Sequence, residues 1–216
     1  MAANDCFHHC GLLWYLFIAV KAIDPGPMYT KVADIYSYQD PSRVLENSTP
    51  LILYRTSAGW NNRASLCMKS VFISKDENGT LRTIQYYTQK PQRPFVEFIN
   101  VTFKMMANLT TSEQPFIDVE PQEKLPPVAS TWFSYWSADD TRVLFADESC
   151  ILMGQYIVTG GRTFCMLWIK EDGLHNPPGH CNFMLVSFCG KPVYNAYQNE
   201  KTLCDIYEKM PDVWRH

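Results

Sequence analysis

Cysteine is the residue type in this sequence whose number and placement can do the most chemistry. There are eight cysteines, and Cys6 and Cys10 lie in the first ten residues. An even remainder of six fits three disulfides, for which sequence alone allows fifteen pairings. Disulfides persist in oxidising compartments, so this set predicts an exported protein. The six are Cys67, Cys150, Cys165, Cys181, Cys189 and Cys204.

Catalytic motifs are missing from the sequence. There is no G-x-S-x-G elbow, no H-E-x-x-H motif and no glycine-rich phosphate loop. His175 and His180 flank an Asn-Pro-Pro-Gly turn beside Cys181, but a disulfide would remove that thiol from metal binding. The pair Asp139-Asp140 is more typical of a turn than of a catalytic dyad. We expect no enzymatic activity, no metal and no cofactor.

Composition and charge exclude further classes. Of 216 residues, 46% are hydrophobic, 14% aromatic and 19% charged, which predicts a globular chain rather than a disordered one. The formal net charge of −3 provides no basic field for phosphates, so nucleic acid is not an expected partner. The length favours one domain with an appendage.

The first 22 residues have features of an export signal. Residues 11–20 (GLLWYLFIAV) form an apolar run of signal-peptide length that is too short to span a membrane. Val20 and Ala22 place small residues at a cleavage site, although no Lys or Arg precedes the run. We predict a signal peptide over 1–22 and one mature domain over 23–216; the alternative is a buried N-terminal helix.

Four N-x-S/T sequons suit an extracellular glycoprotein. They predict glycans at Asn47, Asn78, Asn100 and Asn108. No stop-transfer helix or lipidation motif follows the signal. We therefore expect a soluble, secreted monomer with no membrane span.

The middle of the chain predicts eight strands with short connections. Asn78-Gly79 and Gly160-Gly161 are hairpin signals, and Asp139-Asp140 is expected to join the fifth strand to the sixth. Eight sequential antiparallel strands can close into an up-and-down barrel, which has no free edge and encloses room for one small ligand. The expected strands are Leu51–Thr56, Leu66–Ser74, Leu81–Thr88, Phe95–Met105, Thr131–Ser137, Arg142–Asp147, Cys150–Tyr156 and Thr163–Lys170.

Helices are expected on either side of the strands. Apolar residues recur at helical spacing over 28–36, and Asp40-Pro41 can start a further turn through Leu45. Another helix is expected from about Pro178 to Cys189, packed outside the barrel, followed by a tail that carries Cys204. The predicted fold class is all-β with flanking helices, an eight-stranded antiparallel up-and-down barrel.

Strand alternation predicts which side chains line the barrel. A glycan on Asn100 must point to solvent, so the odd-numbered residues of its strand point inward. If the cysteine-bearing helix packs outside, Cys150 and Cys165 point outward and their strand neighbours point inward. Leu66 is expected inward as well. The predicted ligand-binding residues are Met68, Phe72, Phe95, Glu97, Ile99, Val101, Phe103, Val143, Phe145, Ile151, Met153, Phe164, Met166 and Trp168.

This predicted lumen is apolar except for Glu97. It would gain roughly 25 cal/mol for each Å² of apolar ligand surface that it covers, which favours a lipophilic guest. The alternative is a core filled by side chains, since packing is the commoner role of any single inward apolar residue. For Glu97 three roles stay open: pairing with an amine, accepting a hydrogen bond from a hydroxyl, or pairing with a buried Arg.

Several short motifs extend over about residues 28 to 207. They are Leu53-Tyr54-Arg55-Thr56, Trp60, Cys67, Cys150, Leu167-Trp168, Cys181 and Cys204. This set resembles the tick salivary lipocalins, a group that includes the histamine-binding proteins. The resemblance implies a lipocalin barrel with disulfides Cys67–Cys204 and Cys150–Cys181, which leaves Cys165–Cys189 as the third pair.

The sequence departs from the amine-binding members of that family. They resemble one another in inward carboxylates that neutralise a cationic ligand, and three such places here hold Ser57, Ile151 and Met166. Because an unpaired buried charge is costly, a lumen without those carboxylates should reject histamine and serotonin.

We therefore expect a secreted protein that sequesters a small lipophilic host ligand, such as an eicosanoid, fatty acid or sterol, to modulate host inflammation or immunity. Two alternatives stay open. One is a biogenic amine scavenger that uses Glu97. The other is an immunomodulator that binds a host immune protein or cell, with the barrel as its scaffold.

Overall fold

The computed structural model describes residues 37–57, 65–89, 96–109, 114–127, 129, 142–159, 162–190 and 193–210, without the side chains of 155–159 and 162–164. The predicted signal peptide, the predicted helix over 28–36 and the predicted strand Thr131–Ser137 lie outside the described residues.

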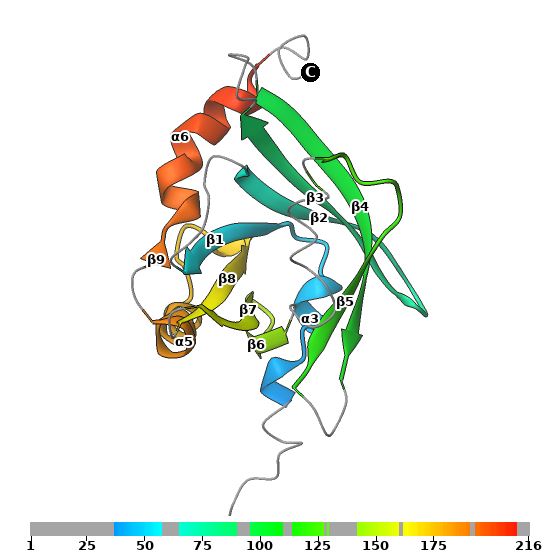
Figure 1. The fold of residues 1–216 in the computed structure, drawn as a ribbon, viewed down its shortest axis with the longest axis vertical. Helices are drawn as coiled ribbons and strands as arrows, with labels where there is room; N and C mark the ends of the chain where they lie inside the picture. The colour runs from blue at the N-terminus through cyan, green and yellow to red at the C-terminus, as the bar shows by residue number, and fades with distance from the viewer. Residues whose placement is uncertain are drawn as a thin grey trace, which may run out of the picture. The chain divides into compact units, whose positions relative to one another are not determined.

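Eight antiparallel strands pair in chain order, and β1 pairs with both β8 and β2, which closes a ring (Figure 1). The predicted eight-stranded up-and-down barrel is confirmed. A short strand, β9, pairs with β1 as an addition to the ring. The strands are β1 Leu51–Ser57, β2 Leu66–Asp76, β3 Gly79–Gln89, β4 Val96–Asn108, β5 Phe116–Pro121, β6 Arg142–Ala146, β7 Cys150–Thr159, β8 Arg162–Lys170 and β9 Val193–Tyr194.

The fifth strand of the ring differs from the expected one. It is β5, which pairs with β4 from Phe103↔Pro121 to Asn108↔Phe116 and meets β6 at Phe116↔Arg142. The segment alternates, with Ile117 buried and Glu120 exposed. Because this alternation is short and ends at a proline, its strand signal is weak, and the prediction passed over it.

The β2–β3 hairpin turns where the Asn-Gly signal predicts. The Asn78 N–H donates to Asp76 Oδ1 at 2.7 Å, and Gly79 has a φ of +138°. A Cβ on Gly79 would lie 2.8 Å from the Met105 carbonyl oxygen, so both the backbone conformation and the close approach of β4 require glycine here.

The helices and helical turns are η1 Ser37–Gln39, α3 Ser42–Leu45, η2 Glu171–Gly173, α5 Gly179–Cys189 and α6 Ala196–Glu208. The Ser42 N–H donates to Asp40 Oδ1 at 2.8 Å, so the predicted turn after Asp40 is present. The predicted C-terminal helix is α5. Figure 1 shows a further helix, α6, beside β1 and β2, where the sequence predicted only a tail.

The sequence signal for α6 is weakened by its own buried face. That face includes Ala196, Glu200 and Tyr207, so a carboxylate interrupts the apolar pattern from which a helix is predicted. Asn195 caps the helix by accepting a hydrogen bond from the Gln198 N–H at 3.2 Å. Among the described segments, no helix combines the length and apolarity that crossing a membrane requires.

Buried apolar side chains form three clusters. The largest, which we call the inner cluster, lies within the ring and includes Val101, Ile151 and Trp168. A second lies between α5 and strands β7 and β8 and includes Leu152 and Leu167. The third joins α6 to the outer face of β2, β3 and β4 through Leu66, Tyr87, Val96 and Tyr207.

Candidate ligand-binding site

The inner cluster contains most of the residues that alternation placed inside the barrel. Strand β4 shows why: it pairs with β3 without a register shift, so the alternation is kept along the strand. Phe103 is 1% exposed, whereas Asn100 is exposed, as predicted from its sequon. The predicted lining residues in the inner cluster are Met68, Ile99, Val101, Phe103, Val143, Ile151, Met153, Met166 and Trp168.

The inward position predicted for Phe145 is wrong. The register of β6 on β7 shifts between Val143 and Phe145, which marks a β-bulge. The extra residue reverses the alternation, so Phe145 packs on the outer side with its ring 5.9 Å from that of His180 in α5. Ala146 takes the inner position in its place.

The inward position expected for Leu66 is wrong for a similar reason. Cys67 has a φ of 59°, and the register of β2 on β3 shifts between Leu66 and Lys69. Leu66 therefore lies opposite Tyr87 in the cluster beside α6, while Met68 stays in the inner cluster.

Three other predicted lining residues lie outside the inner cluster or outside the described residues. Phe72 is half-buried opposite Arg82, with the guanidinium carbon 6.0 Å from its ring centre. Phe95 and the side chain of Phe164 lie outside the described residues. The sequence places both of them inward, and that stays a prediction.

Glu97 is half-buried and lies near Tyr86, a buried member of the inner cluster. Burial, followed by the negative charge of Glu97, raises the pKa of the Tyr86 hydroxyl to about 12. The carboxylate therefore acts on the inner face of the barrel, as alternation along β4 predicts.

Arg82 is a buried cation of the inner face that no pattern in the sequence singles out. It is 0% exposed, and burial lowers its pKa to about 10, so it keeps its charge at neutral pH. Nε donates to Ser70 Oγ at 2.9 Å, and Nη1 donates to the carbonyls of Leu45 at 2.7 Å and Asn47 at 2.9 Å. Nη2 donates to the carbonyls of Ser70 at 3.0 Å and Thr49 at 3.4 Å.

These contacts use all five N–H donors of the guanidinium. Three of the acceptors belong to the segment from Leu45 to Thr49, between α3 and β1. Arg82 therefore fastens this entry segment to the ring, and Leu45 lines the lumen at that point.

One space inside the ring, bounded by residues that the structure describes, is small. A cavity of about 20 Å³ lies between side chains that include Leu45, Ser70, Met105, Met153 and Trp168. That is room for about one water molecule. A larger guest needs these side chains to move, and the methionines are the ones best suited to do so, because the unbranched thioether adopts many shapes.

None of the three positions at which amine binders carry carboxylates is acidic. Ile151 and Met166 belong to the inner cluster. Ser57 is buried, and its Oγ accepts a hydrogen bond from the Cys165 N–H at 2.9 Å. These three positions therefore offer no carboxylate, and the Ser57 hydroxyl is engaged by the backbone.

Disulfides fasten both C-terminal helices to the outside of the ring. Cys150–Cys181 and Cys165–Cys189 join α5 to β7 and β8, and Cys67–Cys204 joins α6 to β2. These are the three pairs that the family resemblance implies. The outward cysteines fix the inward direction of Ile151 and Met166, their neighbours on β7 and β8.

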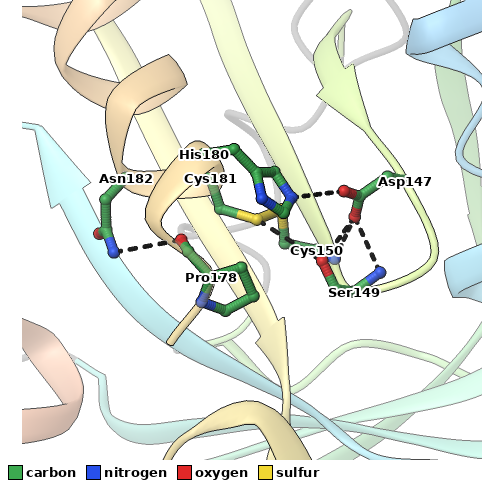
Figure 2. Close-up of a disulfide and its surroundings, with 7 residues drawn as sticks. All are labelled: Asp147, Ser149, Cys150, Pro178, His180, Cys181 and Asn182. Carbon is green, nitrogen blue, oxygen red and sulfur yellow. Dashed lines mark hydrogen bonds and ion pairs between the residues drawn. A yellow bond between two sulfur atoms is a disulfide. The ribbon is translucent and has the colours of Figure 1, made fainter. Parts of the chain in front are cut away.

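Figure 2 shows a polar cluster around Cys150–Cys181. Asp147 Oδ1 accepts hydrogen bonds from the Ser149 N–H at 2.8 Å and the Cys150 N–H at 3.0 Å, and Asp147 Oδ2 lies 2.6 Å from His180 Nε2. Burial acts to raise the pKa of Asp147, but the hydrogen bond from the Ser149 hydroxyl at 2.7 Å, together with those from the Ser149 N–H, the Cys150 N–H and His180, outweighs it and lowers the pKa. Because both sulfurs are in the disulfide, they are not available as metal ligands.

The predicted glycosylation sites differ in exposure. Asn78 and Asn100 are exposed, whereas Asn47 and Asn108 are half-buried. The Oδ1 atom of Asn47 accepts a hydrogen bond from the Thr49 N–H at 2.8 Å. Glycan attachment at the four sequons stays a prediction.

A buried carboxylate, Glu200, holds the bulge of β2 to α6. It is 4% exposed and accepts hydrogen bonds from the Cys67 N–H at 2.7 Å and the Tyr194 hydroxyl at 3.2 Å. Burial raises its pKa to about 7, and the two hydrogen bonds only partly oppose this.

This pKa predicts a pH-dependent stability. The folded state binds the Glu200 proton more tightly than the unfolded state, whose pKa is near 4.5. The stabilisation is therefore complete below pH 4.5 and is lost as the pH rises through 7, by up to about 3 kcal/mol. Chemical denaturation at pH 4.5, 6 and 8 gives the slope of the free energy of unfolding against pH. In Glu200→Gln this slope should lack the contribution of Glu200.

The exposed Glu208→Gln variant, on the same helix, is the control and should keep the wild-type slope. An unchanged slope in Glu200→Gln would show that Glu200 does not titrate in this range.

Comparisons with known proteins agree with this geometry. A family described as "Tick histamine binding protein" matches residues 29–204. No curated protein matches the sequence. Among solved structures, japanin from Rhipicephalus appendiculatus is similar, with 17% identity, a TM-score of 0.51 and coverage of 69% of this chain and 92% of japanin.

Crustacyanin subunits are also similar. Apocrustacyanin C1 has 12% identity and a TM-score of 0.44, and lobster apocrustacyanin A1 has 11% and 0.42. Each comparison covers 82% of this chain and 96% of the other.

The family match extends over most of the chain, including the six cysteines that form the three disulfides. The ring of eight strands is the lipocalin barrel, and the family consists of binding proteins rather than enzymes. This chain therefore belongs to the tick histamine-binding protein family of lipocalins.

Proposed function

We propose that this chain is a secreted binding protein that holds a small lipophilic host ligand in the lumen of its barrel and so sequesters it. The observation that carries the proposal is the apolar inner cluster, which contains Ile151 and Met166. The family resemblance implies that amine binders carry acids at these two positions. A lipophilic guest gains free energy from the apolar surface that such a lining covers, whereas a cation would lose its hydration without a partner.

Japanin, which shares the fold, has been solved bound to cholesterol, and this supports a sterol-sized guest for the present chain. The cavity of about 20 Å³ is far smaller than such a guest. A guest that enters this part of the lumen therefore needs it to widen, through new rotamers of Met105 and Met153 and displacement of Leu45. Such a guest would occupy space that side chains fill in its absence.

Secretion is part of the proposal. Three disulfides join strands to helices around the ring, and such bonds form and persist in oxidising compartments. A secreted member of this family would meet host mediators outside the cell, where sequestration modulates inflammation or immunity.

Native mass spectrometry of the protein, secreted from eukaryotic cells and exposed to a host lipid extract, tests the proposal. We expect a bound lipid that survives buffer exchange and is released on unfolding. An empty protein that instead binds histamine or serotonin would contradict the proposal and favour the amine alternative through Glu97. An empty protein that binds an immune protein or cell would favour the scaffold alternative.

A charge placed in the lumen should abolish lipid capture. Met166 is 5% exposed on the inner face, so Met166→Glu would bury a carboxylate against the guest. We expect lipid affinity to fall at least tenfold, by about 1.4 kcal/mol or more, in a competition assay with a fluorescent fatty acid.

The matched control is Ile73→Glu, which places the same charge on β2 at a position that is 49% exposed. It should bind lipid as the wild type does. Equal affinities for Met166→Glu and Ile73→Glu would exclude Met166 from the binding site.

A further inference from the structure

We infer that the ligand carries a neutral oxygen, as in a lipid alcohol or ketone, and that the Trp168 indole N–H and the Thr56 hydroxyl form the polar subsite that binds it. The inference rests on the proposed function and narrows its ligand class. It follows from two buried polar groups of the inner face for which the described residues supply no hydrogen-bond partner, and from Arg82, whose donors are already bonded.

Trp168 is the first of these groups. Its side chain is 2% exposed and lines the cavity within the ring. Among the described residues, the Trp168 Nε1 atom has no hydrogen-bond acceptor. Buried donors in folded proteins are almost always paired, so an unpaired indole N–H beside a cavity indicates an acceptor that enters with a ligand.

Thr56 is the second. It is 0% exposed, and its Oγ1 atom likewise has no partner in the part of the chain that the structure describes. Thr56 lies opposite Met166 on the β1–β8 ladder, and Leu53 lies opposite Trp168. Cross-strand partners share a face, and Met166 and Trp168 are two residues apart, so Thr56 and Trp168 are neighbours on the inner face.

The chemistry of these two groups selects among ligands. An indole N–H only donates, so it requires an acceptor, and an ammonium group has only donors. A hydrocarbon leaves the indole unpaired. A hydroxyl or ketone oxygen can accept from Trp168, and a hydroxyl can also donate to Thr56.

The part of the inner face that the structure describes does not favour a carboxylate. A buried carboxylate needs a cation with a free donor. The five donors of Arg82 are bonded to Ser70 and to the carbonyls of the entry segment, Leu45, Asn47 and Thr49. Arg82 is therefore committed to holding this segment, and a neutral oxygen suits the subsite better than a fatty acid anion.

Matched probes that differ by one oxygen test the inference. Cholesterol and cholest-5-ene form one pair, and 1-hexadecanol and hexadecane form another, with palmitate as the anionic probe. Each is delivered from methyl-β-cyclodextrin to the secreted protein with its disulfides intact. We expect each alcohol to bind about tenfold more tightly than its hydrocarbon, and palmitate to bind more weakly than hexadecanol.

Two variants then locate the effect. Trp168→Phe should remove the difference in affinity between each alcohol and its hydrocarbon, whatever its effect on both affinities together, and the nearly isosteric Thr56→Val should reduce this difference. Phe103→Leu, which alters a buried side chain of the inner cluster without a polar atom, should change both members of a pair alike. In the wild type, hexadecanol but not hexadecane should shift the Trp168 indole resonance in ¹⁵N–¹H spectra.

The outcomes separate the two proposals. Equal affinity of the wild type for alcohols and hydrocarbons would overturn the subsite and leave lipid binding intact. An alcohol preference that persists in both Trp168→Phe and Thr56→Val would also overturn it. Failure of the wild type to bind any probe in either pair would overturn the proposed function together with the subsite.

Discussion

Arg82→Met is expected to lower the free energy of unfolding by about 3–5 kcal/mol. The wild-type guanidinium is 0% exposed and bonded to five acceptors. Methionine has a similar length but donates no hydrogen bond. The carbonyls of Leu45 and Asn47 would therefore lose the bonds that they accept from Arg82. The entry segment that carries Leu45 into the lumen would then separate from β3.

Urea denaturation of the oxidised protein, followed by Trp fluorescence, measures this loss. Arg82→Lys should lie between the wild type and Arg82→Met, because an ammonium keeps the charge and three of the five donors. The control is Arg43→Met in α3, at an exposed position, which should cost about 0.5 kcal/mol or less. A loss below about 1 kcal/mol for Arg82→Met would contradict the role of this residue in fastening the segment.

Removal of Cys67–Cys204 by double substitution with alanine is expected to destabilise the protein more than removal of either other disulfide. The bond closes a sequence separation of 137 residues, whereas Cys165–Cys189 closes 24. In the chain-entropy description these loops correspond to about 5 and about 3.5 kcal/mol. Cys67 also adopts the positive φ that turns Leu66 toward α6, and its N–H binds Glu200.

Thermal and urea unfolding of the two double variants under identical oxidising conditions makes the comparison. The Cys67→Ala/Cys204→Ala protein should be less stable by about 1–2 kcal/mol than Cys165→Ala/Cys189→Ala. In the first variant, hydrogen exchange should increase in α6 while α5 stays protected. Equal stabilities with unchanged exchange in α6 would show that this disulfide does not anchor the helix.

Sequence alone predicted the ring of strands. It also predicted which side chains point into the ring wherever a strand has no register shift. Strand β4 keeps one register along β3, so the alternation anchored at Asn100 correctly placed Ile99, Val101 and Phe103. The cysteines did the same for β7 and β8. In these cases a local pattern and one outward marker are sufficient.

The errors fall where a bulge adds one residue to a strand. Phe145 follows the shift in β6, and Leu66 precedes the one in β2. A bulge reverses the facing of the residues on one side of it relative to those on the other side. Its position depends on pairing with a neighbouring strand and not on local composition. The short strand β5 was missed because its few apolar residues are stabilised mainly by β4.

The hydrogen-bond partners of the buried polar groups could not be predicted from the sequence either. Arg82 alternates with Ile84 and Tyr86, which places it inside, but three of its five acceptors are carbonyls of a segment more than thirty residues earlier. Carbonyl groups are present at every residue and leave no compositional signal. For the same reason the sequence does not indicate that Glu200 accepts a hydrogen bond from the Cys67 N–H.

A crystal structure of the secreted protein, purified after exposure to a host lipid extract, tests the central claim most directly. The account predicts continuous density for a lipid inside the ring, in contact with Met105, Met153 and Trp168, with Leu45 displaced and an oxygen of the lipid near Trp168 Nε1. Density for those side chains in their present packing, with a lipid bound elsewhere or not at all, would contradict it.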